Sequence, residues 1–302
     1  MERKIGISTF TLQNIYGNEA VFEIAKKVGA DCVDFNLHTN EFDCETENSI
    51  YSRSDDEIIE FFSHLKRKAD QAGIEIAMTH GRMSTFKNIP EWDNRVINNA
   101  RIDCLATSIL GASVCVMHGV SNCNFPKDVD PEFLRNLNFD LFSKVLPFAR
   151  EYGIKIAAET LGDAPNHGTC CLFGYTHEFL KAYNRISEEG EFGDCFASCM
   201  DTGHTNKVVR FDNPTPGDAI RQIGKSICAL HLHDNNGLTD QHKIPLTGSI
   251  NWKDVFDALD EIGYSGVYNM EVSLDCFGKG IEIETAKYAV KVMRNFLSTR
   301  YK

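Results

Sequence analysis

The sequence lacks any apolar run of the roughly 20 residues that a membrane-spanning helix needs. Its first residues, MERKIGISTF, contain two basic residues but lead straight into a short strand-like run. There is no apolar stretch of signal-peptide length and no small-residue cleavage site. We therefore expect a cytoplasmic protein that does not enter a membrane.

The chain also has fewer basic than acidic residues. Lysine and arginine together number 31, against 43 aspartates and glutamates, which gives a net charge of −12. A surface with this balance repels a polyanion such as DNA, and the chain has no basic stripe that follows a phosphate backbone. A small polar molecule is the expected partner, and nucleic acid is not.

Two further absences concern cysteine pairs and linkers. None of the eleven cysteines forms a Cys-x-x-Cys pair, so a thiolate zinc site is not indicated and the thiols are expected to be reduced core residues. No proline-rich, serine-rich or single-sign charge run divides the chain. Residues 1–302 are expected to form one domain, and this length is ample for an α/β barrel.

What the sequence does contain is a repeated alternation of a short apolar run with an amphipathic stretch, which is typical of βα units and a parallel sheet. Eight such runs predict strands at Lys4–Phe10, Cys32–Asn36, Ile74–Thr79, Ser113–His118, Ile154–Glu159, Ala197–Asp201, Ile227–His231 and Val267–Glu271. The predicted helices are Glu19–Val28, Asp56–Ala72, Trp92–Leu110, Pro131–Tyr152, Thr176–Ala182, Pro216–Ile223, Trp252–Ile262 and Ile281–Leu297. Gly73, Gly111, Gly153 and Gly263 follow four of these helices, where a left-handed cap favours glycine. Eight units predict a closed (β/α)8 TIM barrel.

Metal-capable side chains end these apolar runs or follow them closely. They are His80, His118, Glu159, Asp201, His204, His231, Asp240, His242 and Glu271. A parallel barrel gathers the carboxyl ends of its strands around one pocket, so these residues are expected to become neighbours. Taken singly, such an acidic residue can cap the next helix and a histidine can be a hydrogen-bonded structural group.

The strongest group comes from four successive strand ends: Glu159, Asp201, His231 and Glu271. Carboxylates with one imidazole suit manganese, magnesium, cobalt or zinc, and they leave room for oxygens of a substrate. Because a buried carboxylate without a partner is costly, the group predicts a divalent metal ion as cofactor. His233 faces the same side of the strand as His231 and is an alternative ligand.

Several of these residues lie in segments that resemble a known family. Glu159 in AAETLG, the Asp201-Thr-Gly-His204 element, the His231-Leu-His-Asp run and Glu271 in NMEVS are similar to motifs of the xylose isomerase-like barrel superfamily. The resemblance spans the chain and implies an (αβ)8 barrel with metal at its mouth. The superfamily includes sugar isomerases, ketose 3-epimerases, inosose dehydratases and the endonuclease IV group, and homodimers or tetramers are common in it.

The resemblance to the ketose epimerases implies a reaction. Glu159 and Glu271 match their two metal-bound glutamates, which remove and return the proton next to a carbonyl through a metal-stabilised cis-enediolate. His204 matches a substrate-binding histidine. Two substrate positions of that family differ, because Pro165 and Gly237 stand where it has glutamate and arginine. The expected function is therefore a metal-dependent isomerase or epimerase of a sugar, sugar phosphate or polyol.

The resemblance to endonuclease IV implies an alternative. His80, His118, Asp240 and His242, with His204, match the additional ligands with which that group holds three zinc ions, and Glu159 would bridge two of them. This pattern favours a zinc phosphodiesterase, whereas Leu246-Thr247-Gly248 replaces an expected Gly-Glu-Gly. His80 and His118 can instead orient substrate hydroxyls. A barrel that binds metal and sugar without turnover is the third alternative.

Overall fold

The computed structural model describes residues 3–300, and in this part of the chain eight parallel strands form a nearly closed barrel. The strands are β1 (Ile5–Ser8), β2 (Cys32–Asn36), β3 (Glu75–His80), β4 (Val114–His118), β5 (Lys155–Glu159), β8 (Phe196–Asp201), β9 (Ile227–His231) and β10 (Tyr268–Met270). They pair in chain order from β1 to β9, and β10 pairs with β1. Between β9 and β10 the ring is joined by the bridge of Leu232 with Met270.

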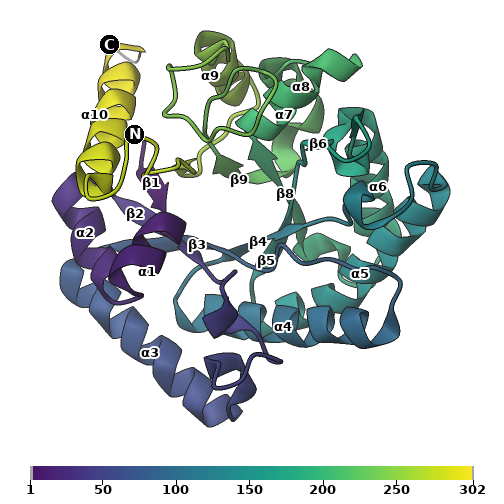
Figure 1. The fold of residues 1–302 in the computed structure, drawn as a ribbon, viewed down its shortest axis with the longest axis horizontal. Coiled ribbons are helices and arrows are strands. Elements are labelled where there is room, and N and C mark those ends of the chain that lie inside the picture. The colour runs from purple at the N-terminus through teal and green to yellow at the C-terminus, as the bar shows by residue number, and fades with distance from the viewer. Residues whose placement is uncertain (1–2, 301–302) are drawn as a thin grey trace.

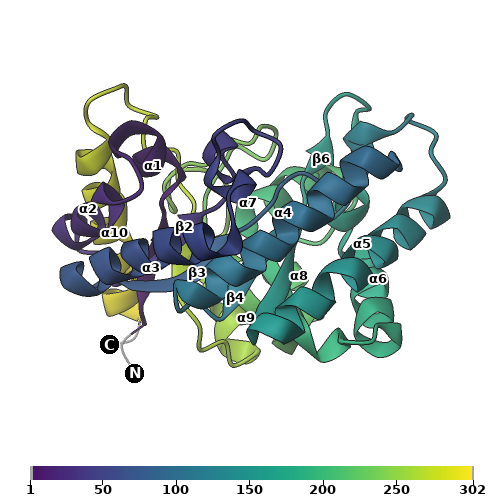
Figure 2. The same ribbon diagram turned by 90° about the horizontal axis from the view of Figure 1, so that it is seen from below.

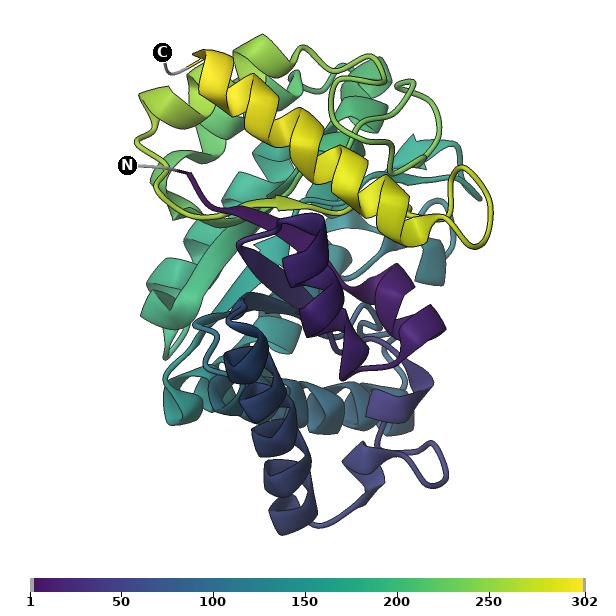
Figure 3. The ribbon, with the colours of Figure 1, turned by 90° about the vertical axis from the view of Figure 1, so that its left-hand side faces the viewer.

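Helices surround the strands on the outside of the ring (Figure 1). The eight long ones are α2 (Ala20–Val28), α3 (Asp55–Ala72), α4 (Pro90–Ile109), α5 (Pro131–Tyr152), α6 (Thr176–Glu189), α8 (Pro216–Ile223), α9 (Trp252–Glu261) and α10 (Glu282–Arg300) among residues 3–300. Figure 3 shows α10 next to α2, so the last helix completes the layer begun by the first helices. No helix in the described range is both long and apolar enough to cross a membrane.

The predicted TIM barrel is confirmed. All eight predicted strand starts lie within one residue of the observed start or on it, and Gly73, Gly111, Gly153 and Gly263 all have φ between 68° and 78°. Glycine is favoured at these positions because other residues rarely adopt a positive φ.

Two short helices and a hairpin were not predicted. The helices are α1 (Phe10–Tyr16) and α7 (Thr202–Val208), and the hairpin pairs β6 (Asp163–Ala164) with β7 (Thr169–Cys170). The predicted first strand extends two residues beyond the observed end of β1, because Phe10 begins α1. Figure 2 shows α1 and β6 on the same side of the molecule, to which the loops after the strands project.

The interior of the barrel is lined by small and medium apolar side chains from five neighbouring strands. They are Met78, Val114, Val116, Ala157, Ala197, Cys199 and Ala229. Side chains two residues apart on a strand face the same side. His80, His118, Glu159, Asp201 and His231 each follow one of these interior residues by two positions, so the strands direct them into the barrel.

The segment 39–56, between β2 and the first turn of α3, is anchored to the barrel. It contains the short 3-10 helices η1 (Asn40–Phe42) and η2 (Ile50–Ser52). Phe42 is buried, and the hydroxyl of the buried Tyr51 donates to Asp103 Oδ1 at 2.7 Å. Arg82, directly after β3, donates to the Phe42 carbonyl and is itself buried. The segment therefore packs against the structure after β3 as a fixed element.

Candidate metal centre

The nine predicted side chains come together at the carboxyl ends of the strands. Parallel register places His118 beside Glu159 and Asp201 beside His231, so ligands on adjacent strands lie at the same level. Four overlapping groups of potential ligand atoms result among the described residues: His80, His118 and Glu159; His80, His231 and Glu271; Glu159, Asp201, His231 and Glu271; and His204, Asp240 and His242 together with His233. Atoms within each group lie within 4.8 Å of one another.

Glu159 lies at the centre of the cluster. Its two carboxylate oxygens are 2.9 Å from His118 Nε2, 3.2 Å from His204 Nδ1, 3.3 Å from His231 Nδ1 and 3.4 Å from His80 Nε2. The side chain is fully buried, yet neither oxygen has a hydrogen-bond partner within the described residues. A buried carboxylate in this state costs free energy unless a cation satisfies it. The donor set therefore fits a divalent metal ion.

The ionisation of the carboxylates supports the same conclusion. Burial opposes the charge on Glu159, but the positive field of His118 and His231 outweighs it and holds the pKa of Glu159 well below its usual value. Burial likewise opposes the charge on Asp240, and His204 reverses the effect so that the pKa of Asp240 is lowered. Both carboxylates are thus anionic at neutral pH and suited to binding a cation.

His231 is oriented by Asp34, a residue that the sequence analysis missed. Asp34 is buried in β2, and its Oδ2 lies 3.2 Å from His231 Nε2. His231 Nδ1 then faces Glu159 Oε1 at 3.3 Å and Glu271 Oε2 at 3.5 Å. A carboxylate behind a metal-binding histidine fixes the ring and raises its basicity. The signal available in the sequence was a lone charged residue within the buried run CVDFN.

We expect Asp34→Asn to weaken the affinity of the metal-free protein for zinc by about 10–100-fold, because an amide oxygen accepts more weakly from His231 Nε2–H and no longer raises the basicity of the ring. The measurement is competition with a chromophoric chelator. Asp56→Asn, an exposed position on α3, is the matched control. Equal zinc affinity in Asp34→Asn and wild type would contradict this role for Asp34.

Asp201 has two roles in the structure. Its Oδ1 accepts a hydrogen bond from the backbone N–H of His204 at 2.6 Å and so caps α7. The capping alternative is therefore correct, but it does not exclude ligation, since Asp201 also belongs to the group that contains Glu159 and His231. The cap fixes where His204 emerges from the helix.

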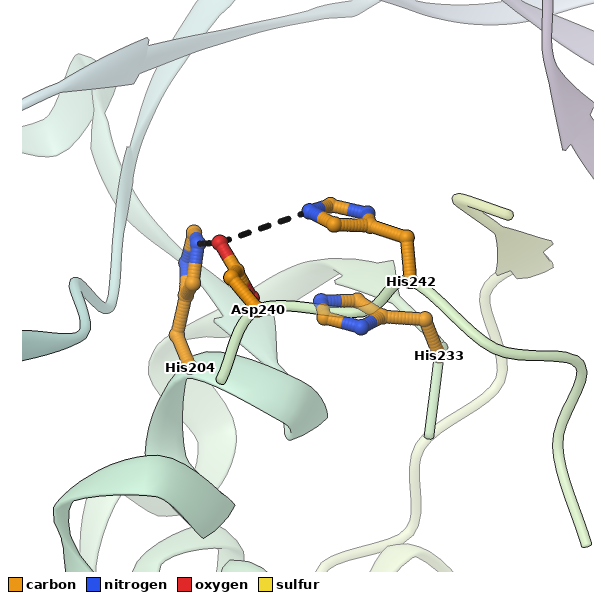
Figure 4. Close-up of side chains that lie close together, drawn as sticks. All are labelled: His204, His233, Asp240 and His242. Carbon is orange, nitrogen blue, oxygen red and sulfur yellow. Dashed lines mark hydrogen bonds and ion pairs between the residues drawn. The ribbon is translucent and has the colours of Figure 1, made fainter. Parts of the chain in front are cut away.

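His204, Asp240 and His242 converge from α7 and from the loop after β9 (Figure 4). Asp240 Oδ2 lies 3.2 Å from His204 Nε2 and 3.5 Å from His242 Nε2. The other ring nitrogens donate to backbone carbonyls: His204 Nδ1 to Thr160 at 3.1 Å and His242 Nδ1 to Glu271 at 2.9 Å. Because these hydrogen bonds fix Nδ1–H, each ring directs Nε2 toward Asp240 and can use it for a metal.

The loop that carries Asp240 and His242 is held at Asp234, the last residue of the His231-Leu-His-Asp run. The backbone groups of Asp234 and Lys243 exchange two hydrogen bonds of 2.8 Å. His242 has φ of 43°, a conformation that non-glycine residues rarely adopt. Unusual backbone conformations persist where the surroundings enforce them, and here the enforced turn directs the imidazole into the cluster.

A cavity of about 200 Å³ opens beside the cluster. His80, His242 and Glu271 form part of its wall, and Phe10 and Met83 add an apolar surface that is partly exposed. The volume is below the roughly 300–1,000 Å³ of sites for drug-sized ligands. The cavity therefore suits a small ligand with polar groups on one side and an apolar face on the other.

Metal binding is expected to release protons at pH 7. Burial lowers the pKa of His80 and His242, but Glu159 near His80 and Asp240 near His242 outweigh burial and raise both values to about 9. The metal-free protein thus carries protons on both rings at pH 7, whereas a ligating nitrogen must be free. We expect these two rings to release about two protons per molecule where both bind metal and none where the ion is held by Glu159, Asp201, His231 and Glu271 alone. Where the rings bind metal, the affinity falls as the pH falls. Calorimetry of zinc binding in buffers of different ionisation enthalpy measures the number, and a value of zero would show that neither ring binds metal.

The comparisons with known proteins agree with this fold. The sequence profile of the xylose isomerase-like TIM barrel family matches residues 22–296. The uncharacterized protein MJ1311 of Methanocaldococcus jannaschii is 30% identical over 214 residues, which cover 69% of this chain and 68% of that protein.

Two solved structures share the architecture. A D-tagatose 3-epimerase-like protein superposes with a TM-score of 0.72 and 21% identity, over 98% of this chain and 97% of that one. The IolI protein with a bound zinc atom superposes with a TM-score of 0.68 and 17% identity, over 95% of this chain and 96% of that one. At these identities the similarity establishes the fold.

Proposed function

Because the chain belongs to the xylose isomerase-like TIM barrel family, we propose that it is a divalent-metal-dependent isomerase or epimerase of a sugar or sugar phosphate. The observation that carries the proposal is the pairing of Glu159 and Glu271 across His231 next to a small cavity. The sugar epimerase named among the structural neighbours and the zinc in the IolI structure support the same reaction class and cofactor.

Glu159, Asp201, His231 and Glu271 would hold the ion, which is manganese, zinc, cobalt or magnesium by the chemistry of the donors. When bound, such an ion stabilises the negative charge that develops on the oxygens of a carbonyl substrate. The ionised Glu159 removes the proton from the carbon next to the carbonyl, and Glu271 returns a proton. His80 lines the cavity and orients a hydroxyl group of the substrate, while His118 and His204 fix the Glu159 carboxylate.

A direct test of this reaction is exchange of the substrate proton with solvent. The metal-loaded protein is incubated in D2O with a panel of ketoses, aldoses and their phosphates, and proton NMR follows deuterium at the carbon next to the carbonyl. Deuterium incorporation together with a new sugar supports the proposal. Metal-loaded protein that binds sugars without exchange would favour the non-catalytic alternative.

A second candidate, a zinc phosphodiesterase, is favoured by ligand groups beyond the one around Asp201 and His231. His80 Nε2 and His118 Nε2 both lie near Glu159 Oε2, and His204, Asp240 and His242 belong to a separate group. Several ions together can activate a water molecule and neutralise a phosphate. Elemental mass spectrometry separates the candidates: one ion per chain supports isomerisation, and three zinc ions with hydrolysis of abasic DNA or a model phosphodiester support the second function.

A further inference from the structure

His233 is the member of the cluster that the sequence offers only as an alternative ligand to His231. It follows β9 by two residues and is completely buried. Its ring stacks on that of His242 with centroids 3.9 Å apart and planes inclined by 7° (Figure 4). The residue therefore lies between the group around Glu159 and the group formed by His204, Asp240 and His242.

Nε2 of His233 could either donate a hydrogen bond to Asp201 or bind a metal ion. Nε2 lies 3.0 Å from the Asp201 carboxylate, and the residue also belongs to the group of His204, Asp240 and His242. A nitrogen that carries a hydrogen and donates it to Asp201 has no lone pair left for a metal. The two uses therefore exclude each other.

The surroundings of the other nitrogen decide between them. His233 Nδ1 has no hydrogen-bond partner within the described residues and faces Gly203. A hydrogen on Nδ1 would be a buried donor without an acceptor, and buried N–H groups in this state are rarer in proteins than buried acceptors without a donor. The favoured tautomer thus carries its hydrogen on Nε2 and donates to Asp201.

Gly203 makes this arrangement possible. A Cβ atom at position 203 would lie 1.9 Å from His233 Cε1 and 2.3 Å from Nδ1. Only glycine leaves room for the ring, so the Asp201-Thr-Gly-His204 element and His233 fit together sterically. Thr202 adds a second link, because its Oγ1 donates to the His233 carbonyl at 2.9 Å and accepts from the His233 N–H at 3.1 Å.

From this geometry we infer that His233 is a positioning residue and not a ligand. It holds the Asp201 carboxylate in place by donating to it from Nε2. Within the other group, His204, Asp240 and His242 remain as the residues that could hold an ion. The inference rests on the metal binding in the proposed function, but not on the proposed reaction.

The test compares two substitutions that differ in hydrogen-bond donation. His233→Gln keeps an N–H donor near the position of Nε2, and His233→Phe keeps a ring of similar size without a donor. Zinc affinity and stoichiometry of the metal-free proteins are measured by chelator competition and elemental mass spectrometry. We expect His233→Phe to lose about 10–100-fold in affinity, His233→Gln to stay close to wild type, and both to keep the wild-type number of ions.

Equal losses in both variants, or one ion fewer in both, would show that His233 is a ligand and overturn the inference. Wild-type affinity in both variants would overturn it as well. His177→Phe, at an exposed position on α6, is the matched control. If His233→Phe does not fold, Gly203→Ala displaces the ring without removing it and is expected to weaken zinc binding. If the wild-type protein binds no metal, the proposed function is overturned as well. Metal binding by the wild-type protein therefore distinguishes a failure of this inference from a failure of the proposed function.

Discussion

Glu159→Gln is expected to lower kcat/KM for the proposed substrate class by about 10³-fold or more, with the fold retained. Glutamine occupies nearly the same volume, but its amide cannot accept the substrate proton. Glu159 also belongs to two of the four ligand groups, and its oxygens lie within 3.4 Å of four histidines. The variant is therefore expected to bind fewer metal ions in addition to losing its base.

Turnover, metal content and circular dichroism are measured on the same preparations of this variant. Glu284→Gln, at an exposed position on α10, is the matched control and should match wild type in all three. A Glu159→Gln protein with full activity would refute the proposed mechanism. Full metal content combined with lost activity would instead assign Glu159 to proton transfer alone.

Asp234→Ala is expected to lower the free energy of unfolding by about 4 kcal/mol, because four donors would lose a charged acceptor. Asp234 is fully buried. Its Oδ1 accepts from the backbone N–H groups of Asn235 at 2.9 Å and Ile250 at 3.2 Å. Its Oδ2 accepts from the Gly248 N–H at 2.9 Å and from Trp252 Nε1 at 2.7 Å.

The same carboxylate fixes the loop that carries Asp240 and His242, so metal binding to that group should weaken together with stability. Urea unfolding measures the first effect and chelator competition the second. Asp234→Asn keeps one acceptor oxygen and should lose about half as much stability. Asp128→Ala, at an exposed turn, is the control. A change below about 1 kcal/mol in Asp234→Ala would show that this hydrogen-bond network is not important for stability.

The barrel could be predicted from the sequence because each βα unit carries its own local signal. Apolar runs, amphipathic stretches and the four glycines with positive φ are all visible in short windows. The missed helices α1 and α7 have seven residues each, too few for a clear helical period. α7 also follows Asp201, the last residue of β8, without an intervening loop, so the sequence shows no boundary between strand and helix.

The candidate ligands could be predicted because strand ends of a parallel barrel converge whatever the details of the loops. Their supporting residues could not, because their roles depend on contacts across the barrel. Asp34 and His231 are on strands that are not neighbours in the sheet, and Asp234 acts through the loop of residues 240–250. His233 was interpreted as an alternative to His231, whereas the structure places it against Asp201 and His242.

The contact between β9 and β10 determines where the barrel opens most easily. In the described chain these two strands meet only at the bridge of Leu232 with Met270, whereas the other neighbours share longer ladders. Local opening requires the least free energy where the fewest hydrogen bonds must break. His231 ends β9 and Glu271 follows β10, so an ion held by both would cross-link the barrel at its weakest join. The proposed reaction and the closure of the barrel between β9 and β10 would then depend on the same ion.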